Sequence, residues 1–277
     1  MGRKLFCQLS PFTYALSTLK CRLVRRVRDA VSGKKFARVR QAEKLPCVIY
    51  QSKSLMRRKL GKVDPQLQEN KVVNLRLAAP KISGILIRPG ETFSFWRLVG
   101  NCSARKGYQT GLVIAGGAPG RGVGGGMCQF TNLIHWLVLH TPLEITEHHH
   151  HDGVDLFPDY GRQIPFGTGT SILYNYLDYE FKNTTDQTFQ LIVGTTEEYL
   201  CGELRADAPL PVRYHIRTED EHFAREGGTV YRTGRVYRDC IDKHTGNLLE
   251  HRLIKVNHAR VMYDLPPEQI TEQKSKN

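Results

Sequence analysis

The chain has 277 residues, of which 40 are Lys or Arg and 27 are Asp or Glu, so its formal net charge is +13. At roughly 150 residues per domain, this length allows one large domain or two small ones. A content of 40% hydrophobic and 24% charged residues is ordinary for a globular protein and excludes wholesale disorder, collagen and coiled coil.

The N-terminal segment, residues 1–62, carries the whole positive excess, with 17 basic and 2 acidic side chains. Apolar residues recur at helical spacing over residues 14–31, and arginine and lysine occupy most of the remaining surface, so we predict a basic amphipathic helix. Such a helix could lie on an anionic membrane surface, pack on its own domain or bind nucleic acid phosphates. We expect no nucleic acid partner, because the basic residues up to Lys62 show neither aromatic interleaving nor a recognition motif.

The sequence also bears on location and redox state. Its longest apolar runs are far shorter than the roughly 20 residues of a membrane-spanning helix, and the N-terminus lacks the apolar segment of a secretory signal. Seven cysteines form an odd set without CxxC spacing. We therefore expect reduced thiols, and a location in the cytoplasm or peripherally at the inner face of the membrane.

The middle of the chain alternates between helical and extended patterns. We predict a helix over residues 72–79 that ends before Pro80, strands over 82–87, 92–96 and 112–115, and a loop over 116–126 in which seven residues are glycine. A helix over 127–140, with one apolar stripe, and a strand over 143–147 follow.

Patterns typical of β-hairpins occupy the last third of the chain. We predict that residues 179–183 pair with 188–193, and that 230–241 pair with 248–256. The chain is thus predicted to be α+β, with a cysteine-bearing helix packed on an antiparallel sheet. We divide it into the basic helical segment 1–62, a central domain over 63–208 and a β-hairpin C-terminal extension over 209–277.

The most informative residues are Gly124-Gly125-Gly126-Met127-Cys128-Gln129. Cys128 falls in the first turn of a predicted helix, where free backbone N–H groups and the helix dipole favour thiolate and lower the thiol pKa from about 8.5. The glycines let the backbone approach a substrate closely, and the N–H groups of the turn could receive an oxyanion. We therefore take Cys128 as a candidate nucleophile, and Gly125, Gly126 and Gln129 as candidates for substrate or oxyanion binding.

A nucleophilic cysteine needs a base, and His148-His149-His150-His151 follows the next strand. Because alternate residues of an extended segment share a face, His149 and His151 are predicted to point toward the start of the helix. Candidates for an orienting group are Asp152, Asp155 and Asp159, with Gln163 as a neutral option, and spacing does not choose among them.

Two alternatives use the same residues. Cys128, His149 and His151 could hold a metal, although no fourth ligand is evident, so we expect neither a metal nor a cofactor. The spacing Gly120-x-Gly122-x-x-Gly125 formally matches the dinucleotide fingerprint, but the first glycine lies five residues beyond the strand and no further βα units follow.

These residues resemble the VanW family, which is first known from glycopeptide-resistance gene clusters. The matching elements are residues 89–95, 99–100, 106–108, the glycine–cysteine–glutamine block 124–129, 143–147 with the histidines after it, and 178–183. The resemblance covers roughly residues 70–205. The family usually has Ser where Asp152 stands and an Asp near Gln163, so the orienting group differs here.

What the resemblance implies is a cell-wall role accessory to glycopeptide resistance. Some members are implicated as L,D-transpeptidases that use the motif cysteine. By this analogy Cys128 attacks a stem-peptide amide and releases D-alanine, and His151 acts as base and then acid. Because stem peptides bear carboxylates, the charges of Arg105, Lys106 and Arg121 make these residues candidates to bind them. The partner is a peptidoglycan stem peptide or lipid-linked precursor, and the rival hypothesis is a non-catalytic protein that binds or scaffolds such precursors.

Overall fold

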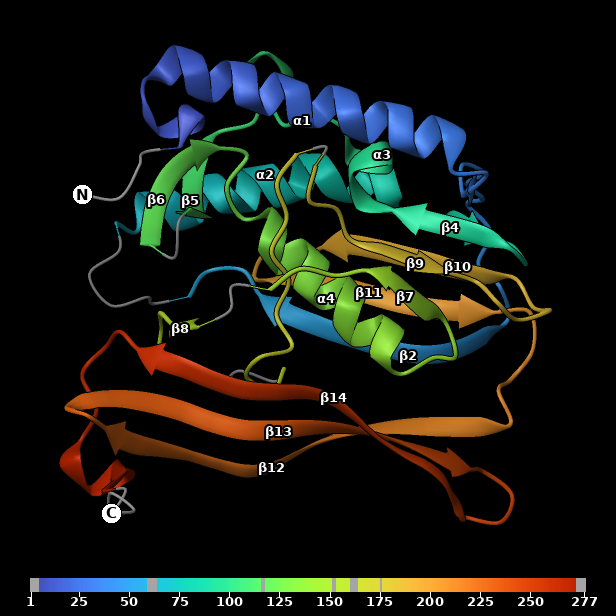
Figure 1. The fold of residues 1–277 in the computed structure, drawn as a ribbon. Coiled ribbons are helices and arrows are strands. Elements are labelled where there is room, and N and C mark those ends of the chain that lie inside the picture. Colours follow the sequence, from blue (N-terminus) through green and yellow to red (C-terminus); the bar gives the residue numbers. More distant parts are fainter. Residues whose placement is uncertain are drawn as a thin grey trace.

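The computed structural model describes residues 5–58, 64–115, 118–150, 153–159, 164–174 and 176–272. Three predicted site residues, His151, Asp152 and Gln163, lie outside these ranges. Over the described part, the chain has the predicted α+β fold, in which a long helix lies along one side, helices and two sheets fill the middle, and a sheet of long strands lies along the opposite side (Figure 1).

The predicted amphipathic helix is confirmed as α1 (Pro11–Val31), which follows the short 3₁₀ turn η1 (Phe6–Gln8). Its start is fixed by Ser10, whose side chain accepts a hydrogen bond from the Thr13 backbone N–H (3.1 Å), and by proline at the first helical position. No described helix has both the length and the apolar character that crossing a membrane would require.

The central antiparallel sheet has the order β2 (Cys47–Leu55), β11 (Tyr199–Ala206), β10 (Phe189–Thr195) and β3 (Ile85–Ile87). The cysteine-bearing helix α4 (Met127–Leu139) packs on it, as predicted, and approaches closely at Gly202, where a Cβ would lie 2.8 Å from Leu137. This contact belongs to the main hydrophobic core, which also includes Leu191 and Leu204 of the same sheet. Strand β2, an edge of this sheet, comes from the predicted N-terminal segment.

A second sheet has the order β1 (Lys35–Phe36), β4 (Glu91–Ser94), β9 (Glu180–Lys182) and β7 (Glu144–Glu147). The predicted hairpin between 179–183 and 188–193 is therefore wrong, because β9 pairs with β4 and β7 whereas β10 pairs with β3 and β11. The turn between β9 and β10 carries the chain from one sheet to the other, and this choice depends on strands distant in sequence.

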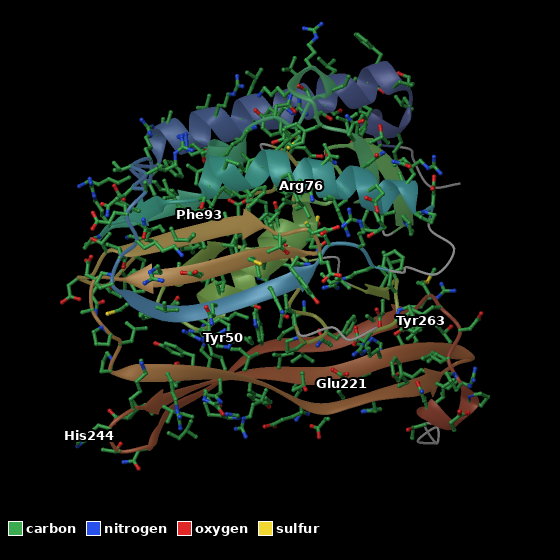
Figure 2. The ribbon with its side chains drawn as sticks, turned by 180° about the vertical axis from the view of Figure 1, so that it is seen from behind. Tyr50, Arg76, Phe93, Glu221, His244 and Tyr263 are labelled. Carbon is green, nitrogen blue, oxygen red and sulfur yellow. The ribbon has the colours of Figure 1, made fainter. Side chains whose placement is uncertain are left out.

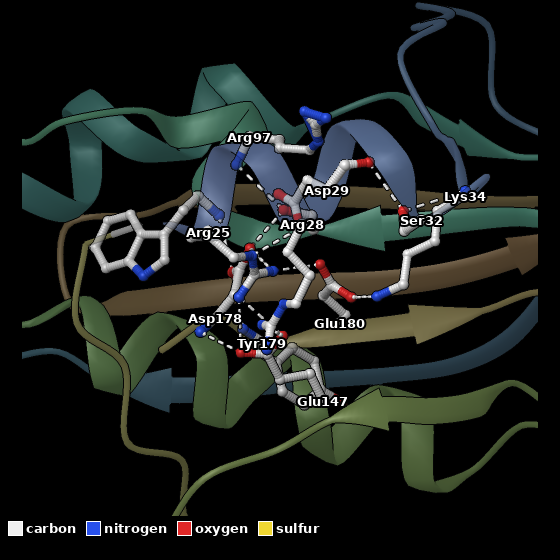
Figure 3. A network of polar contacts seen from close by, with 12 residues as sticks. Arg25, Arg28, Asp29, Ser32, Lys34, Arg97, Glu147, Asp178, Tyr179 and Glu180 are labelled. Carbon is white, nitrogen blue, oxygen red and sulfur yellow. Dashed lines mark hydrogen bonds and ion pairs between the residues drawn. The ribbon is translucent and has the colours of Figure 1, made fainter. Parts of the chain in front are cut away.

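Helix α1 is fastened to this second sheet by Arg25, which is only 3% exposed. Its guanidinium contacts Glu147 (2.9 Å), Glu180 (2.6 Å) and Asp178 (3.6 Å), and Nε contacts Asp29 on α1 itself (2.8 Å). Figure 3 shows these carboxylates converging on Arg25 from the helix and from the strands below it. A polar face of the helix that carries Arg22 and Arg25, rather than its apolar stripe, thus meets the protein.

Two predicted boundaries are corrected. Helix α2 (Gln66–Ile82) continues past Pro80, because a proline this close to the end removes only one hydrogen bond of the last turn. The aromatic strand predicted over 92–96 ends at Ser94, where α3 (Phe95–Val99) begins with the Ser94 hydroxyl accepting from the Arg97 N–H (3.3 Å). The 3₁₀ turn η2 (Ala104–Lys106) follows.

The predicted loop over 116–126 is also partly wrong, since a strand occupies much of it. Strand β6 (Ala118–Val123) pairs antiparallel with β5 (Thr110–Ala115), with Gly120 opposite Val113 and Gly122 opposite Gly111. Small residues allow this two-stranded ribbon to lie close to its neighbours, a tertiary effect that overrides the poor strand propensity of glycine.

The C-terminal sheet has the order β15 (Ile270–Glu272), β12 (Val212–Glu226), β13 (Thr229–Asp242), β14 (Leu248–Val261) and β8 (Val154–Asp155), and η3 (Pro267–Gln269) precedes β15. The predicted β13–β14 hairpin is confirmed, with Ile241 opposite Leu248. Figure 2 shows this sheet beneath the body of the protein, with His244 at the tip of that hairpin. Buried Arg238 joins the sheet to the end of α4 by donating from Nε to the Leu139 carbonyl (2.8 Å).

Candidate functional site

The glycine loop leads directly into α4 at Cys128. Gly126 is the N-cap residue with φ of 104°, and Gly124 has φ of 80°, so both adopt the left-handed conformation that favours glycine. Cys128 is the second residue of the helix, which confirms its predicted place in the first turn.

Close packing fixes this loop against α2 and β5. A Cβ on Gly125 would lie 2.4 Å from the backbone carbonyl carbon of Gly111, and one on Gly126 would lie 2.2 Å from Cγ of Lys71. Asn74 of α2 donates from Nδ2 to the Gly125 carbonyl (2.8 Å). The start of α4 is therefore held in one position by both neighbours.

Cys128 lines a cavity of about 520 Å³, a volume that suits a small ligand or a segment of peptide. Gly125, Gly126 and Gln129 line it too, so four of the predicted site residues share one cavity. A larger hollow of about 840 Å³ along β2, β10 and β11 contains none of the predicted site residues.

The predicted lowering of the Cys128 pKa is wrong. Burial raises the pKa of this thiol, and this effect outweighs the backbone N–H of Ile172, which favours the thiolate. The N-terminal turn of α4 thus holds a neutral thiol, which needs a base before it can act as a nucleophile. All seven cysteines of the chain fall within the described residues, and all are free thiols.

The histidine run does not supply that base within the described residues. Nε2 of His149 contacts Glu147 (3.0 Å), beside the Arg25 network, and no histidine is among the described residues that line the cavity. His148 faces α4 instead, with its ring 4.1 Å from that of His135, and burial lowers the pKa of His148 to about 3. His148 and His149 thus point in different directions, but it is His148, and not His149 as predicted, that faces α4. The prediction for His151 falls outside the described residues.

Of the orienting candidates, Asp152 and Gln163 are outside the described residues, whereas Asp155 and Asp159 do not line the cavity, and neither do the predicted carboxylate-binding groups. Asp155 and Asp159 both pair with Arg232 of β13 in the C-terminal sheet. Exposed Arg121 contacts Asp64 (3.3 Å) and does not line the cavity, and neither Arg105 nor Lys106 does.

Gln129 lines the cavity, but its amide has a structural task. Its Nε2 donates to the Ser54 hydroxyl and to the Leu55 carbonyl, both at 2.8 Å. These bonds tie the first turn of α4 to the end of β2, so the amide nitrogen helps to position Cys128 and its neighbours.

The structure adds a residue that the sequence analysis missed. Lys71 of α2 lines the same cavity, is only 6% exposed and donates to Oε1 of Gln68 (2.7 Å). Burial, reinforced by the charge of Arg58, lowers the pKa of Lys71 to about 7, so that neutral amine is present at physiological pH. Its signal in the sequence is a polar stripe on α2, since Gln68, Lys71 and Asn74 recur every three residues and all three are buried.

The cavity is electropositive. Arg22 of α1 and Arg58 line it together with Lys71, and the lining contains no Asp or Glu among the described residues. Two buried donors at this cavity, Nε of Arg22 and Nε2 of Gln68, have no hydrogen-bond partner in the part of the chain that the structure describes. Unpartnered buried donors are costly to a folded protein, so an acceptor-rich ligand would satisfy them.

The structure also bears on the two alternatives from the sequence, a dinucleotide-binding loop and a metal site. The dinucleotide interpretation is wrong, because Gly120 and Gly122 lie within the antiparallel ribbon β5–β6 and not in a turn between a parallel strand and a helix. For the metal alternative, Cys128 and His149 belong to different surroundings and His151 lies outside the described residues. Within the described ranges, no cluster of three or more His, Cys, Asp or Glu side chains could hold a metal.

Comparison with known proteins now identifies the family. The family model described as "VanW like protein" matches residues 70–205. The chain is 33% identical over 266 residues, covering 96% of both chains, to the "Vancomycin B-type resistance protein VanW" of Enterococcus faecalis (strain ATCC 700802 / V583). It is also 30% identical over 117 residues, 41% of this chain and 36% of the relative, to the "Uncharacterized protein YoaR" of Bacillus subtilis (strain 168). No solved structure gives a significant match. The cysteine-bearing domain and nearly the whole chain around it therefore belong to the VanW family.

Proposed function

We propose that this protein contributes to vancomycin resistance by acting on peptidoglycan stem peptides, or on their lipid-linked precursors, in the cavity at Cys128. The observation that carries the proposal is the composition of this cavity, which combines a cysteine at a helix N-terminus, a buried lysine and two arginines. We place this activity at the inner face of the membrane, where such precursors are assembled.

The ligand chemistry fits the charge of the cavity. Stem peptides carry carboxylates, and guanidinium groups bind carboxylates through paired hydrogen bonds. Arg58 and Arg22 are the cations offered by the cavity wall, and they replace Arg105, Lys106 and Arg121 in this role. Nε of Arg22 and Nε2 of Gln68, which have no partner among the described residues, would gain acceptors from the ligand.

The reaction proposed for the site is acyl transfer. The neutral Lys71 amine takes the proton of the Cys128 thiol, and the sulfur attacks the carbonyl carbon of a stem-peptide amide to give a tetrahedral intermediate. Collapse of the intermediate breaks the C–N bond, and the leaving amine of D-alanine receives the proton from Lys71. An incoming amine, or water, then attacks the thioester and restores the thiol. In this scheme Lys71 takes the role assigned by analogy to His151.

The second candidate is a protein that binds the precursor without reaction. One observation favours it, namely the raised pKa of Cys128, which makes the resting thiol a poor nucleophile. In that case the cavity holds the stem peptide through its cations, and Cys128 is only a small apolar lining residue.

Calorimetric titration with a synthetic stem peptide, together with chromatographic detection of released D-alanine, tests both candidates. The transferase predicts that Cys128→Ala binds the peptide but releases no D-alanine, whereas Cys102→Ala, which alters another thiol of the same cavity, retains release. If wild type and Cys128→Ala both bind the peptide and neither releases D-alanine, the binding protein is supported. If Cys128→Ala releases D-alanine as fast as wild type, Cys128 is refuted as the nucleophile. Absence of binding by wild type contradicts both.

A further inference from the structure

Helix α1 sits on the protein in an unusual orientation. A helix of a globular protein ordinarily buries its apolar stripe and exposes its charges. Here the side toward the protein carries Thr18, Arg22, Arg25 and Asp29, and Arg25 is the one residue of the helix that is fully buried. The apolar stripe is therefore left on the outside.

The stripe is continuous along the helix. At about 100° per residue, Phe12, Leu16, Leu19, Leu23 and Val27 fall within roughly 80° of one another, on the side opposite Arg25. They are between 46% and 76% exposed, and the preceding Leu5, Phe6 and Leu9 are between 53% and 63% exposed. Figure 1 shows α1 along one outer side of the molecule, and Figure 2 shows side chains of this helix that project away from the body. A contiguous exposed apolar strip of this length is typical of an interaction surface.

Basic residues border this strip on both sides. Lys20 and Arg26, both exposed, lie about 60° to either side of the centre of the stripe. Arg28 is 65% exposed and lies farther round the same helix. Apolar side chains flanked by lysine and arginine match the boundary between the acyl chains and the anionic headgroups of a bilayer, where long basic side chains reach the headgroups.

We propose that the outer face of α1, made of Phe12, Leu16, Leu19, Leu23 and Val27 with Lys20 and Arg26, docks the protein on an anionic bilayer surface. The helix lies in the plane of the interface with its axis parallel to the membrane. Arg25 locks the opposite face to the protein, so docking requires no separation of α1 from the fold.

Docking also places the cavity near the membrane, a consequence that rests on the proposed function. Arg22 belongs to the same helix and lines the cavity on the protein side. The cavity is thus separated from the bilayer by about one helix diameter, roughly 10 Å. A lipid-linked precursor could then present its peptide to Cys128 while its lipid remains in the membrane.

Vesicle co-sedimentation of the full chain tests the docking face without any substrate. We expect binding to vesicles made of equal parts of phosphatidylglycerol and phosphatidylcholine, and much weaker binding to phosphatidylcholine alone. Leu19→Glu/Leu23→Glu should lower the affinity at least about tenfold, because it removes apolar contact and adds repelled charge. Lys20→Gln/Arg26→Gln should lower the affinity for anionic vesicles about 30-fold and leave the weak binding to neutral vesicles unchanged.

The matched control is Leu248→Glu/Leu249→Glu on β14, where two leucines of similar exposure, 54% and 58%, lie far from α1. This variant should bind vesicles like wild type. Equal binding of wild type to the anionic and the neutral vesicles overturns the proposal. So does an equal loss of vesicle affinity in Leu19→Glu/Leu23→Glu and Leu248→Glu/Leu249→Glu. The proposal is also overturned if the protein self-associates in sedimentation equilibrium and Leu19→Glu/Leu23→Glu abolishes this association but not vesicle binding. The outer face of α1 would then bind a second copy of the chain. Vesicle binding tests the docking face, whereas stem-peptide binding in solution tests the proposed function of the cavity. The failure of one proposal can therefore be distinguished from the failure of the other.

Discussion

Replacing Arg25 with methionine tests how α1 is held on the protein. The substitution keeps the length of the side chain but removes the charge that faces Glu147, Asp178 and Glu180 (Figure 3). All three carboxylates are largely buried, with side-chain exposures of 12%, 3% and 0%.

The magnitude follows from what remains around these carboxylates. Removing one partner of a buried ion pair costs about 3–5 kcal/mol, because the other charge stays buried without compensation. Glu180 keeps Lys34 (2.5 Å), and Asp178 keeps the Trp96 backbone N–H (3.0 Å). We therefore expect Arg25→Met to lower the free energy of unfolding by about 3 kcal/mol, at the lower end of that range.

The loss should depend on pH. Burial would by itself raise the pKa of Glu147, but the Asp178 N–H, His149 and Arg25 together lower it, so this group stabilises the fold above its unfolded pKa. Without Arg25 the folded-state pKa of Glu147 rises, and the buried carboxylates take up protons on acidification. The difference from wild type should thus be larger at about pH 8 than at about pH 5.

Urea unfolding followed by circular dichroism at both pH values measures these differences. The control is Arg28→Met on the same helix, whose guanidinium is 65% exposed and lies 3.9 Å from Glu147, and it should change stability by no more than about 0.5 kcal/mol. If Arg25→Met costs no more than Arg28→Met, or costs the same at both pH values, the buried network does not hold α1 as described.

Three further predictions concern the glycine loop and the cavity. Gly125→Ala should lower the free energy of unfolding in urea by about 1–3 kcal/mol, because the added Cβ would lie 2.4 Å from the Gly111 backbone. Gly120→Ala should change it little, because the nearest atom to its added Cβ is 3.7 Å away. Equal effects of the two substitutions would contradict the close packing of Gly125. The folded-state pKa of Lys71 is lowered to about 7, so the unfolded chain binds the Lys71 proton more tightly than the folded chain does. Between about pH 7 and pH 9 the free energy of unfolding of wild type should therefore rise by about 2 kcal/mol relative to that of Lys71→Met. Parallel curves of stability against pH for the two proteins would disprove the shift. The rate of iodoacetamide labelling at Cys128 should still rise at about pH 9, and a plateau near pH 7 would show that burial does not raise this pKa.

Local patterns were sufficient for much of the fold. The periodicity of residues 14–31 and 127–140 predicted α1 and α4, and the alternation after residue 229 predicted the β13–β14 hairpin. The errors arose where pairing depends on distant segments. Strand β6 consists of glycine-rich sequence that becomes extended only beside β5, and β9 chooses β4 and β7 over its sequence neighbour β10.

The candidate site likewise contains residues that a local pattern predicts and residues whose role depends on distant segments. The glycines and Cys128 were recognisable because their chemistry depends on a local turn before a helix. Lys71 was not, because its altered pKa arises from burial against Gly126, which lies 55 positions later in the sequence. The direction in which α1 faces was equally hidden, since it depends on carboxylates contributed by β7, β9 and Asp178.

The most direct test of the central claim is mass spectrometry of the intact protein after incubation with a disaccharide tetrapeptide and an acid quench. We expect an acyl adduct that maps to Cys128. It should be absent from Cys128→Ala, present in Cys102→Ala, and slower to form in Lys71→Met. A wild-type protein that binds the peptide but never carries an adduct, or an adduct that persists in Cys128→Ala, would contradict the proposed acyl transfer.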